Sequence, residues 1–127
     1  MAIINFGSIN IDHVYQVEHF VQPGETLASH HYQQLLGGKG ANQSIALAKA
    51  GAEVRHVGRI HNNDAHIKQT LIKQGIDCKH VQCGDTPSGH AIIQVTPSAE
   101  NAIVLFGGAN QELDHKSVLA ALDGAKS

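Results

Sequence analysis

The residues best suited to chemistry in this 127-residue chain lie in one glycine-rich segment, Gly37-Gly38-Lys39-Gly40-Ala41-Asn42-Gln43. A flexible loop that leads into a helix presents unpaired backbone N–H groups and the positive end of the helix dipole, and both suit an oxygen-rich ligand. Lys39 and Asn42 add side-chain donors, and Asn42 also offers an acceptor. The alternative is a glycine loop that only turns the chain.

Neither of the two common nucleotide-binding motifs fits this segment. A P-loop requires glycine where Gln33 stands and a hydroxyl residue where Gly40 follows Lys39. A dinucleotide fingerprint requires its third glycine at the position of Gln43. The segment therefore predicts a site for a polar ligand, but not a nucleotide site of the P-loop or dinucleotide type.

A second polar cluster follows the first apolar run of the chain. Asn10 and Asp12 come just after a predicted strand, and ligands in open α/β sheets bind beyond the carboxyl ends of strands. The Asp12 carboxylate can accept hydrogen bonds from two adjacent hydroxyls, as a vicinal diol requires. The alternative is an Asx-turn that closes the loop.

The elements that position these residues alternate along the chain. Short apolar or β-rich runs predict strands, and a helix from Ala41 to Ala50 presents Ala41, Ile45 and Ala48 on one face and ends at Gly51. Asn63 or Asp64 can cap a second helix that ends at Gly75. The predicted strands are 2–6, 13–17, one or two within 26–36, 54–60 and 76–81. This order predicts a parallel sheet flanked by helices.

The C-terminal part follows a different pattern. Residues 90–95 and 102–106 are apolar runs separated by Pro97-Ser98-Ala99-Glu100-Asn101, which predicts a β-hairpin with a longer loop. Asp114 can cap a last helix that runs towards Ala125.

Composition and charge narrow the class of protein. The chain is 42% hydrophobic and has a net charge of −2, with nine Lys and Arg residues scattered along it, so we expect no nucleic-acid partner. No leader and no apolar run of about 18 residues is evident, so we expect a cytoplasmic protein without a membrane segment. Cys78 and Cys83 are expected to be reduced thiols.

Three linked motifs carry a family resemblance: Gly7-Ser8-Ile9-Asn10-Ile11-Asp12-His13, Pro23-Gly24-Glu25-Thr26 and the glycine-rich segment. Together, in this order, they resemble the N-terminal part of the ribokinase-like, or phosphofructokinase-B, family of carbohydrate kinases. The resemblance covers about residues 3–122. Further matches are Val57-Gly58-Arg59-Ile60, Asp64, Gly75-Ile76-Asp77, Pro87-Ser88-Gly89 and Gly108-Ala109-Asn110.

The resemblance implies an α/β, ribokinase-like three-layer fold with a parallel sheet and a small β-sheet lid. Residues 1–127 would be the N-terminal part of that domain, truncated, with lid segments at about 13–36 and 89–106. It implies that Asn10 and Asp12 bind sugar hydroxyls, and that Gly38, Lys39 and Asn42 close the sugar site. It also implies a homodimer formed through the lid.

The activity that the resemblance implies is ATP-dependent phosphorylation of D-ribose, or a close pentose, at its primary hydroxyl. The cofactors would be ATP and Mg²⁺, with a monovalent cation such as K⁺. The alternatives are a non-catalytic sugar-binding or dimerising fragment, and a family kinase for another sugar, 2-deoxyribose included, or for a nucleoside.

The chain departs from the family pattern in two ways. His61 and His66 stand where the family has glycines, which costs about 1 kcal/mol each if those positions require positive φ. The alternative is a metal site of His61, Asp64 and His66, although we expect no metal ligands here. The chain also lacks the family's Gly-Ala-Gly-Asp segment, which supplies the anion hole and the catalytic base, so we expect no catalytic residue in it and no activity from it alone.

Overall fold

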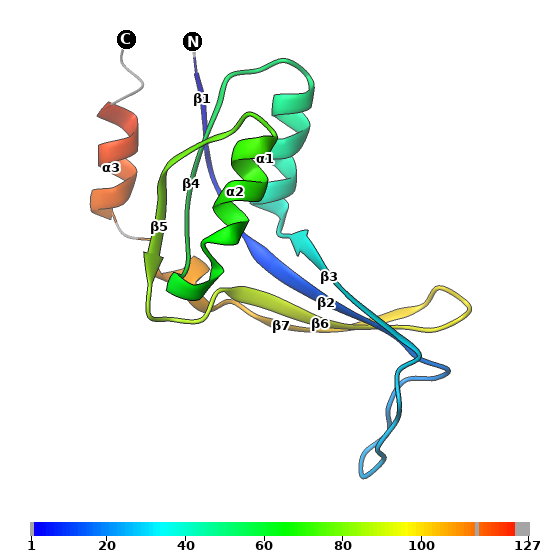
Figure 1. The fold of residues 1–127 in the computed structure, drawn as a ribbon. Coiled ribbons are helices and arrows are strands. Elements are labelled where there is room, and N and C mark those ends of the chain that lie inside the picture. The colour runs from blue at the N-terminus through cyan, green and yellow to red at the C-terminus, as the bar shows by residue number, and fades with distance from the viewer. Residues whose placement is uncertain (1, 114, 124–127) are drawn as a thin grey trace.

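The computed structural model describes residues 2–113 and 115–123, which form two β-sheets and three α-helices (Figure 1). A three-stranded parallel sheet has the order β1-β4-β5, with strands Ile3–Phe6, Val54–His61 and Asp77–Gly84. The helices are α1 (Lys39–Lys49), α2 (His66–Lys73) and α3 (His115–Asp123). The α/β class and the parallel sheet predicted from the alternating pattern are confirmed.

The parallel sheet forms the middle layer of the structure. Figure 1 shows α1 and α2 on one side of it and α3 on the other. The core between the sheet and the first two helices is aliphatic and fully or nearly fully buried, and it includes Ile9, Ala41, Val54, Ile60, Ile67, Leu71, Ile76 and Val81. Burial of these side chains is the main force that fixes the layers, since it removes apolar surface from water.

The second sheet has four strands in the order β3-β2-β6-β7 and projects away from the first (Figure 1). Its central strands β2 and β6 run parallel, whereas β2 pairs with β3 and β6 pairs with β7 in antiparallel fashion. The bounds are Asn10–Gln16 (β2), His31–Gly37 (β3), Gly89–Val95 (β6) and Asn101–Phe106 (β7). The predicted hairpin of β6 and β7 is confirmed, and β2 joins it to the earlier strand pair.

The helix C-termini predicted from glycines are confirmed, whereas the polar N-terminal cap predicted for α2 is not. Gly51 and Gly75 have φ of 94° and 86° just past α1 and α2, as predicted for left-handed C-caps. The predicted cap of α2 is wrong, because Ala65 precedes that helix and makes no side-chain cap. Asp64 instead ends a short 3₁₀ turn, η1 (Asn62–Asp64), and accepts a hydrogen bond from Ser88. Asp114, the predicted cap of α3, lies outside the described residues.

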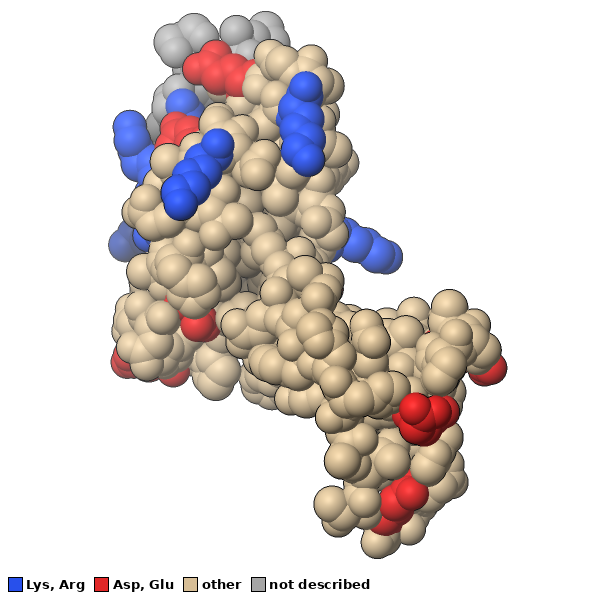
Figure 2. Space-filling model, turned by 45° about the vertical axis from the view of Figure 1, so that its right-hand side comes forward, with Lys and Arg blue, Asp and Glu red and all other residues tan. Residues whose placement is uncertain are grey.

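Charge is distributed unevenly between the two sheets. Residues 10–37 and 84–112, which include all four strands of the second sheet, contain no Lys or Arg. Figure 2 accordingly shows basic side chains only on the part built from the parallel sheet and its helices, and acidic ones on both that part and the projecting part. Among the described residues no helix is long and apolar enough to cross a membrane. Cys78 and Cys83 are free thiols, and burial raises the pKa of Cys78 to about 11.

Candidate functional site

Asn10 and Asp12 belong to β2, not to a loop after β1 as the sequence analysis placed them. Asn10 pairs with Gly37 of β3 and Gly89 of β6, and Asp12 pairs with Leu35 and Ala91. Because side chains alternate along a strand, Asn10 and Asp12 lie on the same face of the sheet. The Asx-turn considered as an alternative for Asp12 is therefore wrong.

The carboxylate of Asp12 lies over the backbone of Gly37. A Cβ atom at Gly37, which is buried, would collide with both carboxylate oxygens and the carboxyl carbon of Asp12. Burial raises the pKa of Asp12, and the charge of His13 opposes this rise only in part. The pocket for the carboxylate thus exists because β3 ends in a residue without a side chain.

Asn110 holds Asn10 in one orientation. The Asn110 side chain accepts a hydrogen bond from the backbone N–H of Ile9 at 2.9 Å and donates one to Oδ1 of Asn10 at 2.8 Å. Because that oxygen accepts from Asn110, the Nδ2 group of Asn10 is the part of its side chain that remains as a hydrogen-bond donor. Asn110 lies in the 3₁₀ turn η2 (Gly108–Glu112), about 100 residues further along the chain. Sequence reasoning noted Asn110 only as a family match and missed this role.

The glycine loop packs tightly against the chain that follows β1. Gly38 precedes α1 with φ of 93°, which favours glycine, and a Cβ there would lie 2.7 Å from Ser8 O and 3.0 Å from Asn10 N. A Cβ at Gly7 would lie 2.5 Å from the Cα of Gly40. These contacts bring Gly38 next to Asn10, and through Gly37 they bring the loop next to Asp12.

The first turn of α1 offers fewer free N–H groups than the sequence analysis predicted. Ser8 accepts hydrogen bonds from Ala41 N through its carbonyl at 2.9 Å and from Gly40 N through its hydroxyl at 3.4 Å. Lys39 and Asn42 are exposed, and neither side chain bonds to another described residue. The structure therefore places Gly38 next to Asn10 and, through Gly37, near Asp12. The side chains of Lys39 and Asn42 are exposed at the edge of the same loop.

Apolar side chains surround Asp12 on its face of the sheet. The strand register places Leu35 and Ala91 beside it, and Ile93, Ile103 and Leu105 lie further along the same face. Three of them are well exposed: Leu35 by 48%, Ile103 by 56% and Leu105 by 64%. A carboxylate within an apolar surface suits a ligand that has hydroxyls on one side and C–H groups on another. The sequence analysis missed these residues, because the pairing of β2 with β6 was not predicted.

Two grooves lie on the opposite face of the four-stranded sheet. The first, of about 410 Å³, is lined by Ile11, His13, Gln34, His61, Asn63, Asp64, Pro87, Ser88 and His90. The second, of about 310 Å³, lies between the same face and α2. Neither groove includes Asp12 or Asn10, so groove volume alone would point away from the residues with the most suitable chemistry. The polar groups around Asp12, rather than groove volume, define the candidate site.

His61 and His66 do not carry the backbone strain that the sequence analysis considered. His61 has an extended backbone with φ of −73°, and its Nδ1 atom accepts a hydrogen bond from Asn63 N. His66 is the first residue of α2, and Ala99 is the one described non-glycine residue with positive φ. In the described ranges no three His, Cys, Asp or Glu side chains form a group able to hold a metal ion, so the site of His61, Asp64 and His66 is not supported.

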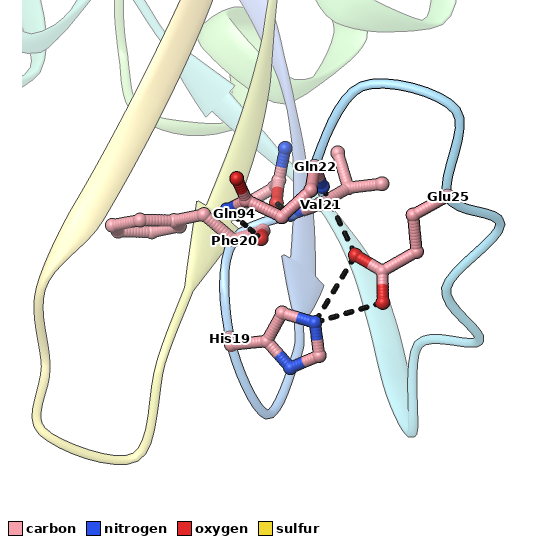
Figure 3. Close-up of polar contacts among 6 residues, drawn as sticks. All are labelled: His19, Phe20, Val21, Gln22, Glu25 and Gln94. Carbon is pink, nitrogen blue, oxygen red and sulfur yellow. Dashed lines mark hydrogen bonds and ion pairs between the residues drawn. The ribbon is translucent and has the colours of Figure 1, made fainter.

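The Pro23-Gly24-Glu25-Thr26 motif forms the turn at the far end of the β2–β3 loop. Glu25 N donates to Gln22 O at 2.9 Å, and the Glu25 carboxylate accepts from Gln22 N and from His19 (Figure 3). The hydrogen bond from the backbone amide of Gln22 lowers the pKa of Glu25 most, and the hydrogen bond from His19 lowers it further. Figure 3 also shows Gln94 of β6 bonded to Val21 N, so this loop is attached to the second hairpin.

Comparison with known proteins supports one family. The model of the pfkB family carbohydrate kinases matches residues 2–126. The ribokinase of Haemophilus influenzae is 44% identical over 115 residues, which cover 88% of this chain and 38% of the relative. The ribokinase of Staphylococcus aureus is 33% identical over 125 residues, covering 95% of the chain and 41% of the relative. The chain thus spans about two fifths of the length of these relatives.

Solved structures agree with this assignment. The ribokinase of Thermotoga maritima superposes with a TM-score of 0.80 at 35% identity, covering 91% of this chain and 41% of that one. The Arabidopsis thaliana ribokinase, solved with ribose and ATP, gives a TM-score of 0.73 at 32% identity, covering 84% of this chain and 36% of that one. The parallel sheet, the four-stranded sheet and the family match together show a ribokinase-like fold over part of its length. The chain belongs to the pfkB family of carbohydrate kinases.

Proposed function

We propose that this chain forms the sugar-binding part of a kinase that phosphorylates D-ribose, or a close pentose, at its primary hydroxyl with ATP. The observation that carries the proposal is the position of Asp12, whose carboxylate lies against Gly37 within an apolar sheet face and next to Asn10. The similarity to ribokinases, one of them solved with ribose and ATP, supports the choice of substrate.

Each residue has a distinct role in the proposed site. Asp12 accepts hydrogen bonds from two adjacent sugar hydroxyls, and the Nδ2 group of Asn10 donates to a sugar oxygen. Gly38 lets the sugar approach the backbone, because it has no side chain. Lys39 and Asn42 close the site from the first turn of α1, where their free side chains can reach the remaining oxygens.

The apolar face beside Asp12 contacts the C–H groups of the sugar. In this proposal the four-stranded sheet, built from about residues 13–36 and 89–106, is a lid over the sugar. Such a lid excludes water, which would otherwise compete with the sugar hydroxyl for the phosphoryl group. The lid residues thereby contribute to positioning as well as to binding.

ATP, Mg²⁺ and a monovalent cation are implied by the family. This chain lacks both common nucleotide motifs, and the part of it that the structure describes offers no group of three His, Cys, Asp or Glu ligands. We propose that the part of the kinase fold that this chain does not span holds the nucleotide, the cations and the catalytic base. When bound, Mg²⁺ neutralises charge on the phosphates, while the residues of this chain hold the sugar in line with them.

Strand β7 is the feature that suggests a dimer. It lies at the edge of the second sheet, and Ile103, Val104, Leu105 and Phe106 are 49–70% exposed. An exposed edge strand can pair with another chain, and a contiguous exposed apolar patch is typical of protein–protein interaction sites. We propose that a second copy covers this sheet. Sedimentation of the full-length protein should give a dimer at about 10 µM that Val104→Glu dissociates. A wild-type monomer at that concentration would contradict the proposed dimer but not the lid.

The test of the activity uses a full-length protein that contains this chain. We expect ATP-dependent phosphorylation of ribose. We expect Asp12→Ala to lower kcat/KM for ribose by an amount that corresponds to a loss of about 2–4 kcal/mol of transition-state stabilisation. Asn42→Ala should have a smaller effect, because it removes a neutral hydrogen bond. Asp77→Ala, which removes an exposed carboxylate paired with Arg55, is the matched control. Unchanged kcat/KM for ribose in Asp12→Ala would remove Asp12 from the site.

The same assay separates the alternatives. Since Asp12 is proposed to bind a vicinal diol, ribose should be preferred over 2-deoxyribose. A preference for 2-deoxyribose would favour a function like that of the Salmonella typhi deoxyribokinase, which is 31% identical over 132 residues. Ribose binding without ATP turnover would favour the non-catalytic alternative.

A further inference from the structure

A buried polar network lies directly beneath the contact between Gly7 and Gly40. His56 of β4 and Ser44 of α1 are both fully buried, and Nδ1 of His56 is 2.7 Å from the Ser44 hydroxyl. Nε2 of His56 is 3.1 Å from the Gly7 carbonyl. Asn5 of β1 donates from Nδ2 to the Ser44 hydroxyl and to the Gly40 carbonyl, each at 2.9 Å.

The partners of these groups define where each proton lies. The carbonyl of Gly7 only accepts, so Nε2 of His56 carries the hydrogen and Nδ1 is the acceptor. The Ser44 hydroxyl then donates to Nδ1 and accepts from Asn5. The second Nδ2 hydrogen of Asn5 is used by Gly40 O. In this neutral arrangement every donor and acceptor that the three side chains aim at one another is satisfied.

The network joins the two chain segments that carry the proposed sugar-binding residues. Gly7 leads through Ser8 into Asn10 and Asp12, and Gly40 lies between Gly38 and Asn42. His56 holds the carbonyl of the first segment, and Asn5 holds the carbonyl of the second. The surrounding core is aliphatic, so buried polar groups here cost free energy unless fully paired, and once paired they favour one geometry.

The imidazole ring is also restrained by packing. A Cβ at Gly58 would lie 3.3 Å from Nε2 of His56 and 3.1 Å from Cδ1 of Ile9. Gly58 therefore leaves room for the ring and little more. A larger residue at position 58 would press against the ring and against Ile9.

We propose that His56, acting through Ser44 and Asn5, is a positioning residue that sets the relative placement of the Gly7–Asp12 segment and the Gly38–Asn42 segment. The consequence for function rests on the proposed sugar site: the network determines sugar affinity and leaves the affinity for ATP unaffected. Networks that support binding residues in this way contribute through geometry, since they do not touch the ligand.

The test measures steady-state kinetics of the full-length protein with His56→Phe, Ser44→Ala and the double variant. We expect the KM for ribose to rise about tenfold in each single variant and the KM for ATP to stay within about twofold. The double variant should resemble the singles, because both disrupt one network. His56→Gln should recover part of the affinity, since it keeps a donor and an acceptor.

Leu71→Ala, which removes buried volume on α2, controls for general destabilisation. It should lower stability without changing the KM for ribose. An unchanged ribose KM in folded His56→Phe, or an equal rise in the KM values for ribose and ATP, would overturn the proposal. If His56→Phe does not fold, the smaller change Ser44→Ala decides the question by the same criteria.

A second measurement distinguishes failure of this proposal from failure of the proposed function. Amide hydrogen exchange at Ala41, whose N–H bonds to Ser8 O, reports directly on the contact between the two segments. Faster exchange in Ser44→Ala, in a protein that does not phosphorylate ribose, would support the positioning role and reject the substrate. Unchanged exchange at Ala41 would reject the positioning role whatever the activity.

Discussion

The carboxylate of Asp12 occupies the space that a side chain on Gly37 would fill. Gly37 has no positive φ, so alanine fits its backbone and the collision is with the far end of the Asp12 side chain. We predict that Gly37→Ala displaces the carboxylate and raises the KM for ribose about tenfold or more, with little change in unfolding free energy. Kinetics and urea unfolding of the full-length protein measure the two effects.

Gly51→Ala is the matched control for that substitution. Gly51 has φ of 94° at the end of α1, and a Cβ there would meet no atom within 4 Å. Alanine should therefore destabilise by about 1 kcal/mol through backbone strain and leave the KM for ribose unchanged. A change in ribose KM in Gly51→Ala but not in Gly37→Ala would show that Gly37 does not form the carboxylate pocket.

Asp12 should contribute to sugar binding but lower the free energy of unfolding. Burial raises its pKa above the ordinary value of 3.8, so the folded state holds the ionised carboxylate less favourably than the unfolded state does. We predict that Asp12→Asn raises the urea midpoint at neutral pH while it weakens ribose binding. In the wild type the destabilisation from Asp12 should diminish as the pH falls through its raised pKa. A lower midpoint in Asp12→Asn would contradict this prediction.

The alternating pattern was enough to predict the parallel sheet, its helices and the β6–β7 hairpin. Those elements depend on local periodicity and on glycines at helix ends, and Gly51 and Gly75 lie where that reasoning put them. The parallel pairing of β2 with β6 was not predicted, because it joins residues about 80 positions apart and leaves no local signal. For the same reason the apolar face beside Asp12 and the bond from Asn110 to Asn10 emerged only from the structure.

Two polar residues show where sequence patterns mislead. Asp64 has the type and position of a helix cap, yet it bonds to Ser88 across the chain. The Ser8 hydroxyl and carbonyl engage two N–H groups that the glycine loop was expected to offer to a ligand. In both cases a tertiary hydrogen bond replaces the local one, which a single sequence cannot reveal.

His56 should make stability depend on pH below neutrality. Burial lowers the pKa of His56 from 6.5, and the hydrogen bond to the Gly7 carbonyl opposes this shift only in part. The groups of Ser44, Gly7 and Gly58 that bond to the ring or pack against it carry no charge. Below pH 6.5 the unfolded chain therefore binds a proton that the folded chain does not, so stability falls as the pH drops through the lowered pKa. Comparing urea midpoints of wild type and His56→Phe at several pH values isolates this contribution. Parallel profiles would show that His56 does not contribute.

The 127-residue polypeptide expressed by itself should not phosphorylate ribose. Phosphoryl transfer requires an anion hole, a catalytic base and a nucleotide site, and each contributes several kcal/mol to the rate. Asp12 cannot replace the base, because its proposed role is to hold hydroxyls that do not react, and Lys39 alone is not a nucleotide site. The exposed apolar strand β7 should also make the isolated polypeptide associate. A coupled ADP-release assay, on material whose mass confirms its length, tests this. Ribose-dependent turnover that disappears in Asp12→Ala would show that the residues for phosphoryl transfer lie within this chain after all.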